Sequence, residues 1–230
     1  GRVLQNQETT SIALFASATY ELTDALTLAG GLRYTDEEKD YVAERFIGPI
    51  GNGASGPVTA DVGDSALSWD ASLTYALNEN VNVYGRVATG FRAPAIQGRI
   101  LFAFGTGGVS VGDSETVTSF EAGIKSSLFE DRARVNVSVF SYEIEDQQLT
   151  AIGGASNANT LLNADKGVGK GFEVDVEALP FDFLQVTAGL SYNDTEIQDA
   201  GLTTVGCGSA CTIYDPFVRV PNPFAADGDG

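Results

Sequence analysis

The chain offers little of the chemistry that an enzyme needs, because it contains no histidine. A Ser-His-Asp triad or a histidine metal ligand therefore cannot be built from these residues. Glu143 and Glu145 could exchange protons with a substrate, but a solvated strand end accounts for them better. Segment 167–171 has a lysine among glycines, but it lacks the spacing and the following Ser or Thr of a phosphate-binding loop. We expect no catalytic residue, no cofactor and no enzymatic activity.

Two arginines are the best candidates for binding a ligand. Arg92 and Arg99 lie at the start of the predicted long connection near 93–115, before its glycine-rich stretch at 105–108. A guanidinium group can hold an anionic group through two parallel hydrogen bonds, so these side chains could contact an anionic ligand. The alternative is a structural or membrane-surface role for each arginine. The acids and glycines at 227–230 are similar to part of a calcium loop but lack its later acidic ligands, so we interpret them as a turn and expect no metal site.

The two cysteines, Cys207 and Cys211, lie in a stretch rich in glycine and serine. Two thiols alone make a poor metal site, so a disulfide is the preferred interpretation. A stable disulfide requires an oxidising compartment, and this expectation therefore depends on export of the protein from the cytoplasm.

The composition limits the class of protein. The formal net charge is −18, which excludes the basic surface that a nucleic acid requires. The acids either form a solvated surface or meet divalent cations at a charged membrane surface. Hydrophobic residues make up 43% of the chain, yet no apolar run approaches the roughly 18–20 residues of a transmembrane helix. A helical membrane protein is therefore excluded, whereas a β-barrel, whose signal is alternation, is not.

Alternation with a period of two dominates the chain, so the elements that position these side chains are β-strands. Apolar and polar residues exchange places at each step, and turn-forming residues separate the segments. The sequence predicts an all-β, antiparallel protein with about eight strands. The predicted strands cover 11–22, 26–35, 67–76, 81–92, 120–125, 133–139, 172–178 and 184–193.

The connections between these strands alternate between short and long. Outer-membrane barrels have short periplasmic turns and long extracellular loops, whereas a soluble sandwich has less reason to keep every second connection short. The pattern therefore favours a transmembrane barrel. The short connections fall at 23–24, 77–80, 127–132 and 180–182, and the long ones near 36–65, 93–115, 146–162 and 194–230.

The two faces of the predicted strands differ in kind. One face carries many charges, which are expensive in the packed interior of a soluble barrel but tolerated in a wide, wet or plugged lumen. The other face is apolar, with aromatic residues that predict two girdles at the membrane interfaces. The predicted lumen charges are Arg33, Asp70, Arg86, Glu121, Lys125, Glu173, Asp175 and Glu177, and the predicted girdles are Tyr20 and Tyr75 at the periplasmic rim and Tyr34, Trp69, Phe91 and Tyr192 at the outer rim.

Several phrases in this framework resemble strands of the TonB-dependent receptor family. They occur in the family's order and with barrel spacing. The phrases are NVYGRVATGFRAP at 82–94, SFEAGIKS at 119–126, FEDRARVNVSVF at 129–140, YEIEDQQ at 142–148 and GFEVD at 171–175.

The resemblance implies that residues 1–230 are part of the β-barrel domain of such a receptor, in a barrel of about 22 strands around a plug. The first predicted strand begins, and the last ends, on the long-loop side, so we expect these strands to belong to a larger wall. The plug domain, the TonB box and the closing C-terminal strands have no counterpart in the sequence. The family's location is the outer membrane of Gram-negative bacteria.

The family also implies the partners and the activity. The partners would be outer-membrane lipid and lipopolysaccharide, the TonB complex acting through the N-terminal plug, and a small-molecule ligand such as a metal chelate or a glycan. The activity would be TonB-energised uptake of a scarce nutrient such as a ferric siderophore.

Three other interpretations fit parts of the pattern. A passive porin-like channel would have the same alternation but no plug. An outer-membrane hydrolase would need a nucleophile and a base, which are hard to build without histidine. A soluble all-β adhesion module would partition into water rather than detergent.

Overall fold

The computed structural model describes residues 1–48, 53–101, 108–153, 158–205 and 217–219. Its main element is one antiparallel sheet of eight strands in the order β1-β2-β3-β4-β7-β8-β9-β10, with two small hairpins, β5-β6 and β11-β12, beside it. In the described part of the chain, no helix has the length and apolar character needed to cross a membrane. The strands are β1 (Arg2–Thr23), β2 (Leu26–Ile47), β3 (Ser55–Asn78), β4 (Val81–Arg92), β5 (Ala95–Gly98), β6 (Val109–Gly112), β7 (Glu115–Leu128), β8 (Ala133–Gly153), β9 (Ala158–Phe181), β10 (Leu184–Ile197), β11 (Thr203–Val205) and β12 (Phe217–Arg219).

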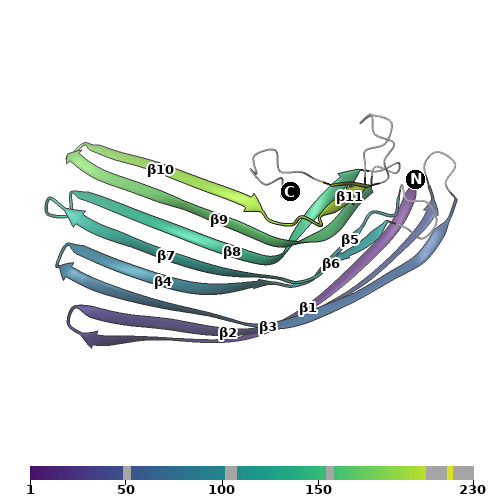
Figure 1. The fold of residues 1–230 in the computed structure, drawn as a ribbon, viewed down its shortest axis with the longest axis horizontal. Coiled ribbons are helices and arrows are strands. Elements are labelled where there is room, and N and C mark those ends of the chain that lie inside the picture. Colours follow the sequence, from purple (N-terminus) through teal and green to yellow (C-terminus); the bar gives the residue numbers. More distant parts are fainter. Residues whose placement is uncertain (49–52, 102–107, 154–157, 206–216, 220–230) are drawn as a thin grey trace.

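All four short connections lie at one end of the sheet, as the sequence predicts (Figure 1). Polar side chains close two of them, since the Thr23 hydroxyl accepts from the Ala25 amide at 3.3 Å and the Asn78 carbonyl from the Asn80 amide at 2.9 Å. The turn between β7 and β8 uses left-handed backbone at 129–131. The small hairpins lie at the opposite end.

The strand register confirms the predicted division into two faces. Arg86 on β4 lies directly opposite Ser72 on β3 and Glu121 on β7, so these three polar side chains share a face. We call this the polar face, and the opposite one the apolar face. The predicted aromatic residues fall on the apolar face, where Trp69 lies opposite Leu32.

The apolar face is unprotected by any other part of the described chain. Leu14 is 73% exposed and Leu190 is 62% exposed, and most other exposed large hydrophobic residues lie on the same face. An apolar surface of this extent is not stable in water. The apolar residues of β1 extend from Ile12 to Leu22, which matches the 9–11 or so residues that a tilted strand needs to cross a bilayer core. The apolar face therefore fits a hydrocarbon environment.

The strands are longer than the sequence predicts, and this is the main correction to the predicted fold. Strands β1, β2, β3, β8 and β9 each have between 21 and 24 residues, about twice the length that a bilayer requires. Most of 36–65 and 146–162, predicted as long loops, is therefore strand. Beyond the membrane the outer face no longer meets lipid, so polar residues occur on both faces and the regular exchange of apolar and polar residues is lost, although the backbone ladder continues.

Candidate functional site

Polar side chains on the membrane-spanning part of the polar face interact with one another across the strands. The Tyr84 hydroxyl donates to Glu121 Oε1 at 2.5 Å, and Lys125 Nζ lies 5.1 Å from the centre of the Tyr84 ring. Arg86 Nε lies 3.9 Å from Asp70 Oδ2, and both side chains are half exposed. Such loosely paired, solvated charges suit the wall of an aqueous lumen rather than a packed core.

The extracellular part of the polar face is covered by a segment that the sequence predicts to be a long loop. We call residues 93–101 and 108–115 the strap; they include β5 and β6 (Figure 1). The strap follows β4 and runs into Glu115, the first residue of β7; β4 and β7 are the two strands that end early. Its contacts reach β2 on one side and β9 on the other. Because β3 and β8 lie between those two strands in the sheet, the strap lies across the polar face.

Four side chains of β1 and β2 bind backbone carbonyls of the strap. Lys39 Nζ donates to the Pro94 oxygen at 2.7 Å, and Arg45 Nη1 donates to the Ile100 oxygen at 2.7 Å. The Gly98 oxygen accepts from the Tyr41 hydroxyl at 3.1 Å and from Gln5 Nε2 at 2.6 Å. No local sequence pattern predicts these four residues, because they lie near or beyond the ends of the segments in which apolar and polar residues alternate.

Side chains of β8 and β9 hold the other margin of the strap. Gln148 Nε2 donates to the Ala93 oxygen at 2.9 Å and to the Asp113 oxygen at 2.8 Å, so one side chain joins the two ends of the strap. Asn163 makes a reciprocal pair with Asp113, accepting from its amide at 2.8 Å and donating to its oxygen at 3.0 Å. The Leu161 amide donates to the hydroxyl of Ser110 at 2.8 Å.

A small dry core forms where the strap meets β2. Tyr41, Ala43 and Ile100 are buried, with Ile100 only 2% exposed. Burial raises the pKa of the Tyr41 hydroxyl above its usual 10.0. Beside this core, Lys39 Nζ lies 2.7 Å from Glu37 Oε1 and lowers the pKa of that carboxyl below 4.5. Ile96 and Val109 of the strap also pack against the cluster of Tyr41, Ala43 and Ile100, so the strap is packed rather than merely hydrogen bonded.

The structure places both predicted ligand-binding arginines at the strap but gives them different partners. Arg92, at the end of β4, has a side chain that is 61% exposed, with Nη1 3.4 Å from Glu115 Oε1. Arg99 donates through Nη1 to Asn159 Oδ1 at 3.2 Å and through its backbone amide to the Gly108 oxygen. Arg92 is therefore accessible from the lumen side, whereas Arg99 holds the strap to β9.

The other predicted site residues fall elsewhere. Cys207 and Cys211 lie outside the described residues. Within the described residues, no group of three or more acids or cysteines is arranged to hold a metal ion.

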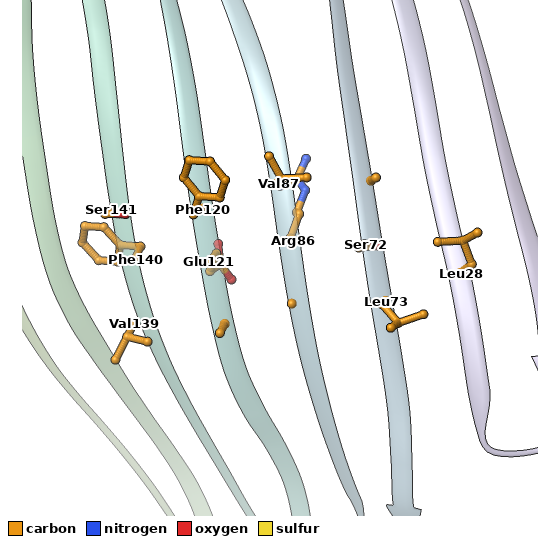
Figure 2. Close-up of a pocket in the computed structure, with 13 residues that line it drawn as sticks. Leu28, Ser72, Leu73, Arg86, Val87, Phe120, Glu121, Val139, Phe140 and Ser141 are labelled. Carbon is orange, nitrogen blue, oxygen red and sulfur yellow. The ribbon is translucent and has the colours of Figure 1, made fainter.

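One groove of the sheet opens on the apolar face. It has a volume of about 700 Å³ and is centred near Gly85, whose missing side chain leaves space between its neighbours on β3 and β7. Leu28, Leu73, Val87, Phe120 and Val139 surround it, as Figure 2 shows. These residues belong to the apolar face, so the groove suits an acyl chain rather than a polar ligand.

An apolar face sized for a bilayer, a polar inner face and short turns at one end together define a wall of an outer-membrane β-barrel. Residues 2–209 match the family described as TonB dependent receptor-like, beta-barrel. The chain belongs to this family, whose members are transport receptors of the Gram-negative outer membrane rather than enzymes.

Two curated relatives are siderophore receptors. The catecholate siderophore receptor Fiu of Escherichia coli K12 is 26% identical over 231 residues, covering 92% of this chain and 29% of that protein. The rhizobactin receptor of Rhizobium meliloti is 32% identical over 152 residues, covering 59% of this chain and 20% of that protein. The chain therefore spans less than a third of the length of these relatives.

Solved structures support the fold. The ferric yersiniabactin uptake receptor FyuA of Yersinia pestis superposes with a TM-score of 0.68 at 17% identity, over 85% of this chain and 28% of that one. The closed form of the ferric-catecholate import receptor Fiu of E. coli K12 superposes with a TM-score of 0.62 at 21% identity, over 85% and 29%.

Proposed function

We infer that this chain forms part of the barrel wall of a receptor that imports a ferric siderophore with energy supplied through TonB. The single observation that carries the proposal is the polar face, which remains wet within the membrane-spanning part while its extracellular part is built up by long strands and the strap. Such a wall fits a receptor that captures a ligand outside and admits it through the lumen. The siderophore receptors among the relatives support the choice of ligand class.

The partners of the receptor follow from the same proposal. The apolar face contacts outer-membrane lipid, and the carboxylates above it face lipopolysaccharide. A plug domain in the same polypeptide fills the lumen and engages the TonB complex.

Arg92 is the residue that we expect to meet the ligand. Its guanidinium is exposed on the polar face, and Glu115 holds it loosely at 3.4 Å. Ferric siderophores of the catecholate class are anionic, and an arginine fork suits such a ligand. Arg99 contributes to the same site less directly, since its Nη1 is already bonded to Asn159.

Growth of a receptor deletion strain tests the function. Under iron limitation, the full-length gene should restore growth on a ferric siderophore and should fail to do so when TonB is absent. Arg92→Gln should weaken uptake by about tenfold, the value of one charge-assisted contact. Arg134→Gln is the matched control, because Arg134 is 64% exposed and pairs with Glu177 at 3.7 Å at the other end of the strands. Rescue of growth without TonB would contradict the proposal.

A passive porin-like channel is the second candidate, favoured by the hydrated charges around Arg86 and Asp70. It requires no energy and no plug. Ion conductance of the full-length protein in planar bilayers separates the two candidates, since a plugged receptor should conduct little until the plug is displaced.

A further inference from the structure

The strap differs from an ordinary surface loop in how it is held. Side chains bind its backbone from both margins, with Lys39 and Arg45 on one side and Gln148 and Asn163 on the other. The partners of each bond are 35 to 55 residues apart in sequence. The strap therefore links β2 with β8 and β9, which are not neighbours of β2 in the sheet.

Separating the strap from these side chains would cost free energy. Arg45 is only 3% exposed, and its guanidinium points to the Ile100 carbonyl in the buried core. Lifting the strap would break the bond from Arg45 Nη1 to the Ile100 oxygen and the bond from the Tyr41 hydroxyl to the Gly98 oxygen, although Arg45 Nε would keep its bond to the Gly53 oxygen. It would also expose Ile100.

Gln148 shows most clearly that the two ends of the strap are held in place by a wall side chain. The side chain is 8% exposed, and its Nε2 serves the two ends of the strap, which fixes the orientation of the amide. As a consequence, its Oε1 is buried without a hydrogen-bond partner among the described residues. An apolar side chain of similar size would avoid burying an unpaired oxygen, but it could not bond to either end of the strap. The two bonds from Nε2 therefore explain why a glutamine lies at this position.

We propose that the strap is a permanent lining of the extracellular mouth, positioned by Gln148 on one side and by Lys39 and Arg45 on the other. The ligand passes over its surface and does not displace it. The strap thereby narrows the extracellular mouth from within. It also fixes the position of Arg92, which directly precedes it at the end of β4, relative to the passing ligand. This inference deepens the proposed function, because it assigns ligand selection to a rigid segment of the same site.

A disulfide between strap and wall tests the proposal in the full-length receptor. A Cβ placed on Gly112 would lie 3.6 Å from the Cβ of Leu161, within the spacing of a disulfide, and it would meet no closer atom than Asn163 Oδ1 at 3.5 Å. Gly112→Cys combined with Leu161→Cys should therefore form a disulfide in cells without added ligand. Each single variant and the wild type, exposed to the same oxidant, are the controls.

The uptake of a radiolabelled ferric catecholate by the oxidised double variant gives the decisive result. We expect a rate within about twofold of that of the reduced variant, since locking a segment that does not move changes little. A loss of tenfold or more on oxidation, reversed by a reductant, would overturn the proposal. So would failure of the disulfide to form while both single variants reach the outer membrane in normal amounts.

Hydrogen exchange of the wild-type receptor provides a measurement that needs no variant and no transported ligand. Peptides from 93–101 and 108–115 should exchange as slowly as those from the extracellular part of β9, and rapid exchange would overturn the proposal. If the wild type transports no ferric siderophore, the proposed function fails. Disulfide formation and exchange still decide whether the strap is docked.

Discussion

The two halves of β2 follow different rules although they belong to one continuous strand. From Leu26 to Tyr34 the outward residues are Gly30 and apolar residues, of which Leu28, Leu32 and Tyr34 are exposed, and the inward residues are small or hydrophilic: Thr27, Ala29, Gly31 and Arg33. From Glu37 to Arg45 the outward residues are mainly acids, and the inward ones bind or bury against the strap. In the first half, contact of the outer face with lipid therefore determines which residue types alternate. In the second half, contacts with the strap determine the inward residues.

The largest expected effect tests the membrane-spanning half. Val137 lies on the apolar face of β8 between Ile124 and Val174, and Val137→Arg should cost about 2–4 kcal/mol near the bilayer midplane. Asn136→Arg is the control, because Asn136 lies on the polar face between Lys125 and Asp175 and should cost far less. Denaturant titration of the full-length receptor in lipid vesicles measures both. Equal losses would contradict the assignment of faces.

The next effect tests the packing of the extracellular half. A Cβ on Gly98 would lie 1.9 Å from the hydroxyl of Tyr41, which is too buried to move aside. Gly98→Ala should therefore loosen the strap at a cost of about 1–3 kcal/mol from overpacking. Gly53→Ala, whose Cβ meets nothing within 4 Å, is the matched control. Limited proteolysis compares the two, and identical cleavage rates would show that the strap is not packed on Tyr41.

A smaller effect is expected at the predicted disulfide between Cys207 and Cys211. We predict that neither thiol reacts with an alkylating reagent until the protein is reduced, as in an oxidising compartment. Because the bond would close a very short loop, reduction should cost only about 2 kcal/mol in the chain-entropy model. Mass spectrometry of the labelled protein measures the reactivity. Full labelling without reductant would mean that both thiols are free.

The smallest effect concerns acid. Lys39 lowers the pKa of Glu37 in the folded protein, so the stability from this pair is present above about pH 4.5 and is lost as the pH falls through the folded pKa. The pair is partly exposed and should contribute about 0.2–1 kcal/mol. Glu37→Gln should remove this part of the pH dependence of strap protection in hydrogen exchange. An unchanged acid profile would mean that Glu37 does not support the Lys39 anchor.

The sequence predicts the membrane-spanning half well and the extracellular half poorly. Lipid requires every second residue to be apolar, so strands such as β4 (Val81–Arg92) can be recognised with nearly correct bounds. No such requirement acts on 36–47, where Lys39, Tyr41, Ala43 and Arg45 also alternate but with mixed chemistry. The strap residues to which Lys39, Tyr41 and Arg45 bind lie more than 50 residues away, so no local sequence pattern predicts these contacts.

The predicted site shows the same limit. Arg92 and Arg99 are correctly expected near one loop, but their separate partners, Glu115 and Asn159, depend on how that loop folds. Gln148, which joins the strap ends, falls within a stretch predicted to be an unstructured connection. The residues that accept these bonds cannot be recognised from their types, since every residue has a backbone carbonyl that can accept a hydrogen bond.

The early ends of β4 and β7 leave an uneven rim. Above Asp70, β3 has no partner on its β4 side, and Thr89 marks the divergence by bonding the backbone of Trp69 with its hydroxyl. On the other side of this gap, β8 beyond Glu145 pairs only with β9. The hairpins β2-β3 and β8-β9 therefore extend beyond β4 and β7 without pairing with each other across this gap. The strap spans the gap on the side of the polar face, with contacts to β2, β3 and β9, so a receptor without the strap would have an opening in its wall as well as at its mouth.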